Sequence, residues 1–261
     1  MFQTIKYGVC LTSISKGHDY ITLFVEMNER KTIHISDGKD NQTVKDFVST
    51  FNEHNGDHTK ITKVSCDMSP AFIKGVKKNL PHAEITFDKF HIIKLINKAV
   101  DEVRQEEVKT VGCLKGSRYA ILKNEANLTQ KQREIRNQLC LSKQKLKTIR
   151  AMHIREAFQD IYKADTIEKF KQQLKEWYFW ATHSQLKPIK KVAKTIKKHW
   201  DGILQWKVTQ INNGLLEGLN SVIQAAKRKA RGYKIDHFKT IAYLLTGKLD
   251  FSWVNKYCKP I

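Results

Sequence analysis

The feature that most constrains the fold is a change in hydrophobic pattern near residue 90. Before it, short runs of β-branched and aromatic residues alternate with helical spacing, whereas after it only helical spacing recurs. A turn at Ser15–His18 predicts a hairpin between the first two strands, and Pro70 suits a first helical turn. The order β-β-β-α-β-α-β predicts an α/β fold, with three antiparallel strands joined to two parallel ones. The predicted strands are 5–14, 19–27, 31–36, 61–67 and 84–87.

The helical remainder divides into several predicted helices. Asp88 is a candidate cap for the first, and Ser184 for the helix that carries Ile189 to Trp200. Residues 212–214 (NNG) predict a turn, and Gly232 marks the end of the helix that follows it. The last helix is predicted from Phe238, Ile241, Leu244 and Leu245.

Charge follows the same division. Residues 1–90 contain 12 Lys and Arg against 11 Asp and Glu, while the remainder contains 35 against 15, within a net charge of +21. This asymmetry favours a near-neutral scaffold joined to a surface that binds a polyanion. The alternative is that the lysines only solvate helix faces.

Several classes of protein are not indicated. No apolar stretch is long enough to span a membrane, and no secretory signal follows Met1, so a cytoplasmic protein is expected. The five cysteines are scattered without a C-x-x-C pair, which argues against a structural zinc site. No Gly-rich phosphate loop occurs, so no nucleotide cofactor is expected.

Two acidic residues follow predicted parallel strands. Asp67 ends the fourth strand and Asp88 the fifth. Because ligands collect at the carboxyl ends of strands in open α/β sheets, these two side chains are candidate ligands for a hard cation such as Mg²⁺. The alternative for both is stabilisation of a helix N-terminus.

A third acid lies beside a basic run. Glu217 shares a helix side with Asn220 and Ser221, and four basic residues follow: Lys227, Arg228, Lys229 and Arg231. A carboxylate beside such a run suits a metal held against a phosphate backbone, although an ordinary surface helix explains it equally.

Residues 187–198 (KPIKKVAKTIKK) predict an amphipathic helix with a lysine-rich outer side. This side could follow DNA phosphates or lie on an anionic membrane surface. Its six lysines are Lys187, Lys190, Lys191, Lys194, Lys197 and Lys198.

Longer blocks point to a family. Residues 64–107 (VSCDMSPAFIKGVKKNLPHAEITFDKFHIIKLINKAVDEVRQEE) closely resemble a block of bacterial insertion-sequence transposases of the ISL3 family. Residues 212–233 (NNGLLEGLNSVIQAAKRKARGY) resemble a second block, and 17–20 (GHDY) a shorter third. Order and spacing agree from about residue 6 to 246.

The resemblance implies a catalytic domain with an RNase-H-like fold and an Asp-Asp-Glu triad. Such domains cut and join DNA with two divalent ions, Mg²⁺ or Mn²⁺. Asp67 matches the second Asp and Glu217 the Glu. We therefore expect a core at 1–90, a helical insertion at 91–208, closing helices at 209–250 and a tail at 251–261.

Two departures from the family pattern matter. The first Asp is expected in a G-[VI]-D-E context, but this stretch reads Gly8-Val9-Cys10-Leu11. A thiol is a poor Mg²⁺ ligand, so we expect impaired catalysis. Asp19 lies beyond the hairpin turn and is a poor substitute, whereas Asp88 is a better one. The family's N-terminal zinc-binding and helix-turn-helix segments also have no counterpart before the first strand, which predicts a truncated, decayed or repurposed transposase.

Two main hypotheses follow. The chain is a transposase catalytic domain of doubtful activity, or a non-enzymatic DNA-binding or regulatory protein derived from one. The expected partners are DNA and either a second copy or an intact transposase, and the expected location is the bacterial cytoplasm, on nucleoid DNA. A weaker third hypothesis places helix 187–198 on a membrane surface.

Overall fold

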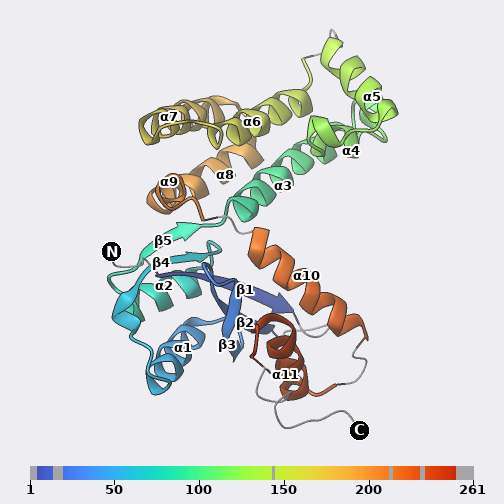
Figure 1. The fold of residues 1–261 in the computed structure, drawn as a ribbon. Coiled ribbons are helices and arrows are strands. Elements are labelled where there is room, and N and C mark those ends of the chain that lie inside the picture. Colours follow the sequence, from blue (N-terminus) through green and yellow to red (C-terminus); the bar gives the residue numbers. More distant parts are fainter. Residues whose placement is uncertain (1–4, 14–19, 143–144, 212–213, 230–232, 251–261) are drawn as a thin grey trace. The chain divides into compact units, whose positions relative to one another are not determined.

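The computed structural model describes residues 5–13, 20–142, 145–211, 214–229 and 233–250, without the side chains of residues 5, 10, 11 and 13. The chain divides into two compact units. The sheet unit comprises residues 1–88 and 209–261, and the helical unit comprises residues 89–208 (Figure 1).

The sheet unit contains five strands in the order β3-β2-β1-β4-β5. β1 pairs antiparallel with β2 and parallel with β4, β2 pairs antiparallel with β3, and β4 pairs parallel with β5. This mixed sheet confirms the predicted α/β fold and strand order. The strands are β1 (Ile5–Ser13), β2 (Tyr20–Glu26), β3 (Lys31–Asp37), β4 (Ile61–Cys66) and β5 (Glu84–Phe87).

Two helices cover one face of this sheet. α1 (Asn41–Glu53) and α2 (Pro70–Asn79) pack on each other, and Pro70 opens α2 as predicted. The ring of Phe47 on α1 stacks on Phe24 at 4.3 Å and lies 5.7 Å from Tyr7, so alternate residues of β1 and β2 face these helices.

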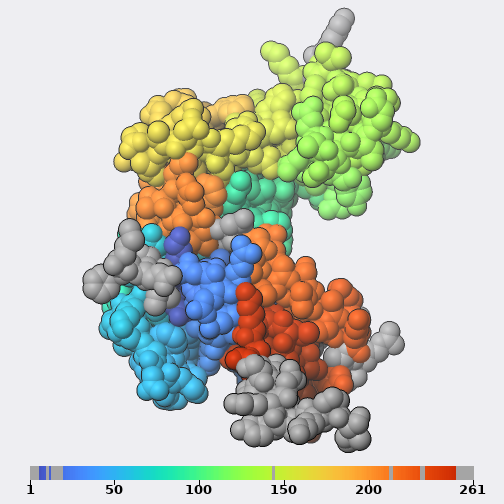
Figure 2. Space-filling model, viewed as in Figure 1, coloured from blue at the N-terminus to red at the C-terminus, as the bar shows by residue number. Residues whose placement is uncertain are grey.

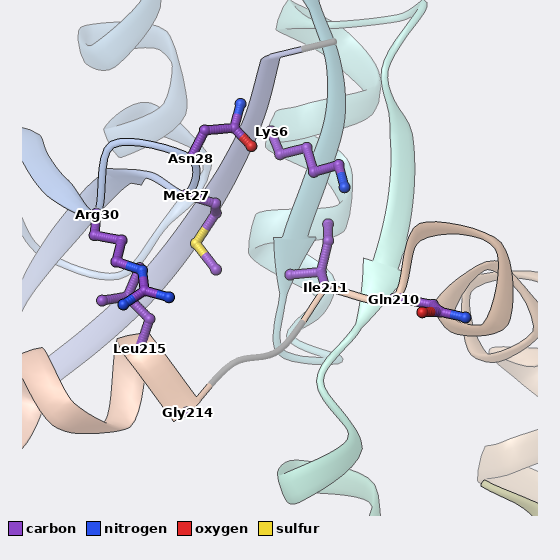
Figure 3. A pocket seen from close by; sticks show the side chains of 8 residues that line it. All are labelled: Lys6, Met27, Asn28, Arg30, Gln210, Ile211, Gly214 and Leu215. Carbon is purple, nitrogen blue, oxygen red and sulfur yellow. The ribbon is translucent and has the colours of Figure 1, made fainter. Parts of the chain in front are cut away.

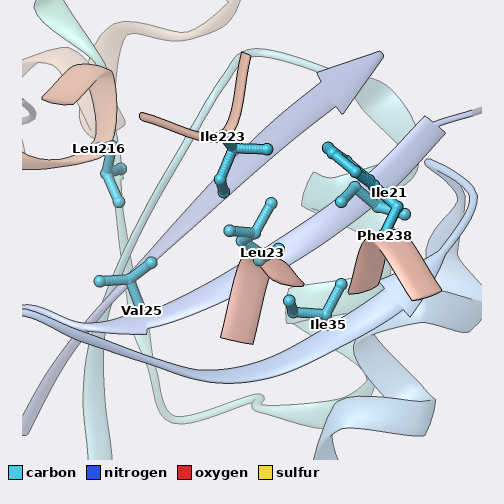
Figure 4. Close-up of a cluster of buried hydrophobic side chains, with 8 residues drawn as sticks. Ile21, Leu23, Val25, Ile35, Leu216, Ile223 and Phe238 are labelled. Atoms are coloured by element: carbon cyan, nitrogen blue, oxygen red, sulfur yellow. The ribbon is translucent and has the colours of Figure 1, made fainter. Parts of the chain in front are cut away.

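The other face is covered by α10 (Gly214–Lys229) and α11 (Ile235–Thr246). Figure 4 shows the buried cluster that joins them to β2 and β3. The strands contribute Ile21, Leu23, Val25 and Ile35, and the helices contribute Leu216, Ile223, Phe238 and Ala242. Because these side chains alternate with those that face α1, the two helical layers bury opposite faces of the same strands.

The helical unit follows β5. In its interior Trp177 of α7 donates its indole N–H to the Ile154 carbonyl of α6 at 2.7 Å. Arg155 is fully buried and donates to the carbonyls of Ile121 and Leu122, so its guanidinium pairs with the end of α4. The helices are α3 (Lys89–Glu107), α4 (Arg118–Leu122), α5 (Gln130–Leu141), α6 (Lys147–Ile161), α7 (Ile167–His183), α8 (Lys187–Lys198) and α9 (Trp200–Thr209), the last residue of α9 falling in the sheet unit.

Two predictions about helices were wrong. Ser184 is the C-terminal cap of α7 rather than the start of the next helix, and the predicted helix from Ile189 to Trp200 breaks at His199. The predicted last helix is confirmed as α11, where Phe238 and Ala242 are buried while Leu244 and Leu245 are about half exposed. The predicted turns at 15–18 and 212–214 and the predicted stop at Gly232 fall wholly or mostly outside the described residues.

Candidate functional site

The parallel strands bring three candidate positions into one line. β1 and β4 pair Gly8 with Ser65, and carrying this register two residues further sets position 10 beside Asp67. β4 and β5 pair Cys66 with Phe87, and one residue further sets Asp67 beside Asp88. Since β4 lies between β1 and β5, positions 10, 67 and 88 line the carboxyl end of the three parallel strands.

Asp67 is half-buried directly after β4. Its Oδ1 accepts a hydrogen bond from the backbone N–H of Ser69 at 2.9 Å, just before α2 begins. This bond engages one of the two carboxylate oxygens but does not cap α2, since Ser69 precedes the first helical residue. Burial and the neighbouring Asp67 raise the pKa of the Cys66 thiol, which favours its protonated form.

Asp88 is 7% exposed and follows β5. Its backbone N–H donates to the Cys66 carbonyl at 3.2 Å, which extends the pairing of β4 and β5 to the level of Asp67. The backbone of Asp88 is therefore held beside the backbone of Asp67.

α10 lies on β1 through two contacts. A Cβ at Gly8 would come within 2.8 Å of Leu216 Cδ2, and Thr12 Oγ1 donates to Asn220 Oδ1 at 2.7 Å. Position 10 lies between Gly8 and Thr12 along β1. The sequence patterns did not reveal either contact, although a glycine within a strand signals close approach of another element.

Glu217 lies in the first turn of α10, next to Leu216, and is exposed. The helix that carries it is therefore anchored on β1 on both sides of position 10. Among the described residues, no group of three or more His, Cys, Asp or Glu side chains is close enough to hold a metal ion. The described side chains of Asp67, Asp88 and Glu217 thus do not converge, and the side chain of Cys10 lies outside the described part.

The predicted DNA-binding residues are divided between the two units. α8 buries Ile189, Ala193 and Ile196, and its lysines are exposed except for Lys190, which is half-buried. In the sheet unit, Lys227, Arg228 and Lys229 form the last turn of α10. Asn220 uses its amide oxygen for Thr12, and Arg231 lies outside the described residues.

A hollow of about 440 Å³ lies at the other end of β1 (Figure 3). Lys6 and Arg30 stand on opposite sides of it, with Met27 between them, and Gly214 and Leu215 from α10 close one edge. Because Lys6 precedes Gly8 on β1, this hollow is distinct from the line of positions 10, 67 and 88.

The mixed five-stranded sheet and the helices on both of its faces define an α/β protein. A family model described as a transposase, of the ISL3 group of DDE enzymes, matches residues 9–242. The chain belongs to this family.

Two curated relatives agree. The transposase for insertion sequence element IS1001 from Bordetella parapertussis is 26% identical over 230 residues, covering 85% of this chain and 56% of the relative. The transposase for insertion sequence element IS1557 from Mycobacterium tuberculosis is 23% identical over 257 residues, covering 88% of this chain and 57% of the relative. The chain thus spans just over half the length of these relatives. No described helix is long and apolar enough to cross a membrane.

Proposed function

We propose that the chain forms the RNase-H-like catalytic core of an insertion-sequence transposase. In this proposal residues 1–90 are the core, 91–208 the helical insertion, 209–250 the closing helices and 251–261 a tail. The observation that carries the proposal is the register that sets positions 10, 67 and 88 side by side, with the Glu217 helix anchored on β1 next to them.

DNA is the proposed partner. The exposed lysines of α8 and the basic last turn of α10 supply positive charge to neutralise phosphates, and the excess charge beyond residue 90 supports this reading. Association with a second copy or with an intact transposase is also proposed, because family members join DNA ends in pairs.

The donor set fits a divalent ion only in part. Carboxylate oxygens of Asp67, Asp88 and Glu217 are of the type that Mg²⁺ or Mn²⁺ prefers, and such an ion would stabilise charge at a reacting phosphate. A cysteine at position 10 does not fit, since a thiol is a soft ligand. We derive no step through the metal and propose that strand cleavage and transfer are impaired.

A second candidate function is that of a DNA-binding or regulatory protein without catalysis. Cys10 favours it, because the substitution removes a carboxylate at the strand end while the basic surfaces remain. The two functions predict the same DNA binding and differ in whether a carboxylate at position 10 restores cleavage.

Nicking of a supercoiled plasmid in MgCl₂ or MnCl₂ tests the proposal. The wild-type chain is expected to nick weakly, and the double variant Cys10→Asp, Leu11→Glu to nick at least about 100-fold faster, because oxygen donors replace a thiol and an apolar residue. Adding Glu217→Gln to this double variant should abolish the gain.

Glu134→Gln is the matched control, since Glu134 is an exposed helical carboxylate of the helical unit. It should leave nicking by the double variant unchanged. Strong nicking by the wild-type chain that Glu217→Gln abolishes would show that position 10 is not required. A double variant that binds the plasmid but never nicks it would favour the non-enzymatic function.

A further inference from the structure

The outer face of α7 carries an unusual stripe of side chains. Lys171, Lys175, Phe179 and His183 follow each other at four-residue intervals and all are exposed. The buried residues of α7 run along the opposite side through Phe170, Leu174, Trp177 and Ala181, so the stripe faces away from the core. α7 is drawn in yellow at the surface of the helical unit in Figure 2.

The aromatic end of this stripe is preorganised. The rings of Phe179 and His183 stack with centroids 4.1 Å apart and planes inclined by 29°. His183 Nδ1 lies 2.7 Å from the Phe179 carbonyl, which fixes the imidazole beside the phenyl ring. Phe179 nevertheless remains 65% exposed, so much of its side chain faces water despite the stack with His183.

The basic part of the stripe is available for a ligand. Neither Lys171 nor Lys175 forms an ion pair within the described part of the chain, in contrast to Lys169 on the same helix, which pairs with Asp165 at 3.4 Å. On one side the stripe is bounded by Glu176, which accepts a hydrogen bond from Gln172 at 2.7 Å.

The other side of the stripe adjoins α8. Tyr178 forms a T-shaped pair with Trp200, and Lys197 of α8 lies 4.6 Å from the Trp200 ring centroid and 5.8 Å from that of Tyr178. Lys197 of α8 therefore lies beside Tyr178, which belongs to the same helix as the stripe.

We propose that this stripe of α7 binds an unpaired DNA strand, with phosphates on Lys171 and Lys175 and a base stacked on Phe179. Residues four apart on a helix are about 6 Å apart along its axis. This is close to the spacing of nucleotides in an extended single strand, and aromatic rings beside a basic track are the usual means of binding one. The inference rests on the proposed DNA function and extends it to a strand whose bases are open.

The test compares a labelled 16-nucleotide single strand with the blunt duplex of the same sequence, using the full chain and fluorescence anisotropy. Phe179→Ala should weaken single-strand binding roughly fivefold to 100-fold and duplex binding little, because only an unpaired base can stack. Phe179→Trp should restore the binding. The salt dependence should stay unchanged in Phe179→Ala and fall by about 0.7 in log–log slope in Lys175→Gln.

Lys169→Gln removes the same charge from a different side of α7 and should leave the slope unchanged. Tyr119→Ala removes an exposed ring from α4 and should leave single-strand affinity unchanged. If Phe179→Ala weakens the binding of the single strand and of the duplex equally, the inference is overturned. It is also overturned if this variant loses the association of the chain with a second copy while its DNA binding stays intact. Failure of the wild-type chain to bind either DNA would instead overturn the proposed function.

Discussion

At the scale of single residues, His34 shows how burial fixes a protonation state. Its ring lies against Phe24 and Phe47, and its Nε2 is 2.7 Å from Ser36 Oγ. Burial lowers the pKa of His34 below 6.5, and His54 lowers it further, whereas Asp46 opposes them. The folded sheet unit therefore favours the neutral ring.

The sign of the pH effect follows from this shift. A histidine with a depressed folded-state pKa contributes stability above its unfolded value of 6.5 and loses it as the pH falls through the folded value. The free energy of unfolding should drop between pH 7.5 and pH 5, and it should drop less in His34→Gln, as measured by urea unfolding. His82→Gln alters an exposed histidine and should retain the wild-type pH dependence. An identical dependence in all three proteins would show that His34 is not the cause.

At the scale of elements, the contact of α10 with β1 decides where Glu217 lies. A Cβ at Gly8 would come within 2.7 Å of Met27 Sδ and 2.8 Å of Leu216 Cδ2, so only glycine permits this approach without displacement. The absence of a side chain at Gly8 therefore allows α10 to lie close to β1.

Gly8→Ala should destabilise the sheet unit by about 1–3 kcal/mol, because the added methyl group pushes α10 away from β1. Gly218→Ala is the matched change on α10, where nothing lies within 4 Å of the added Cβ. It should stabilise the helix by about 0.5–1 kcal/mol. Urea unfolding of both variants checks these values, and equal stability of the two would contradict the described contact.

The sequence predicts the first seven elements well, because alternation and helical spacing are strong there. Prediction from the sequence fails where residue spacing fits two structures. Ile189, Ala193, Ile196 and Trp200 have the spacing of one continuous helix, so the spacing does not reveal the break at His199. The spacing of Phe238, Leu244 and Leu245 predicts the last helix correctly, but it does not show that Leu244 and Leu245 stay half exposed, because a short apolar helix offers more apolar residues than its core contact uses.

The candidate site was predictable only as separate residues. Asp67, Asp88 and Glu217 stand out in the sequence, but the alignment of positions 67 and 88 depends on which strands pair and in what register, which is a long-range property. The Thr12–Asn220 bond and the Phe179–His183 stack are likewise invisible in the sequence, since neither is part of a recognisable motif.

At the scale of the whole molecule, the candidate carboxylates share the sheet unit with the basic last turn of α10, and a further set of basic residues lies in the helical unit. The candidate carboxylates belong to the sheet unit, whereas the lysines of α8 and the stripe of α7 belong to the helical unit. We propose that this family member keeps basic surfaces for DNA, whereas position 10, which the strand register sets beside Asp67, has lost its carboxylate.

Mn²⁺ binding followed by electron paramagnetic resonance tests that claim without DNA. The wild-type chain should bind Mn²⁺ weakly, and Cys10→Asp should bind at least about tenfold more tightly, because a hard oxygen donor is added beside Asp67. Adding Asp67→Asn to Cys10→Asp should remove the gain, and Cys113→Asp, at an exposed cysteine of the helical unit, should produce none. If Cys10→Asp binds Mn²⁺ no more tightly than the wild-type chain, position 10 is not the missing ligand.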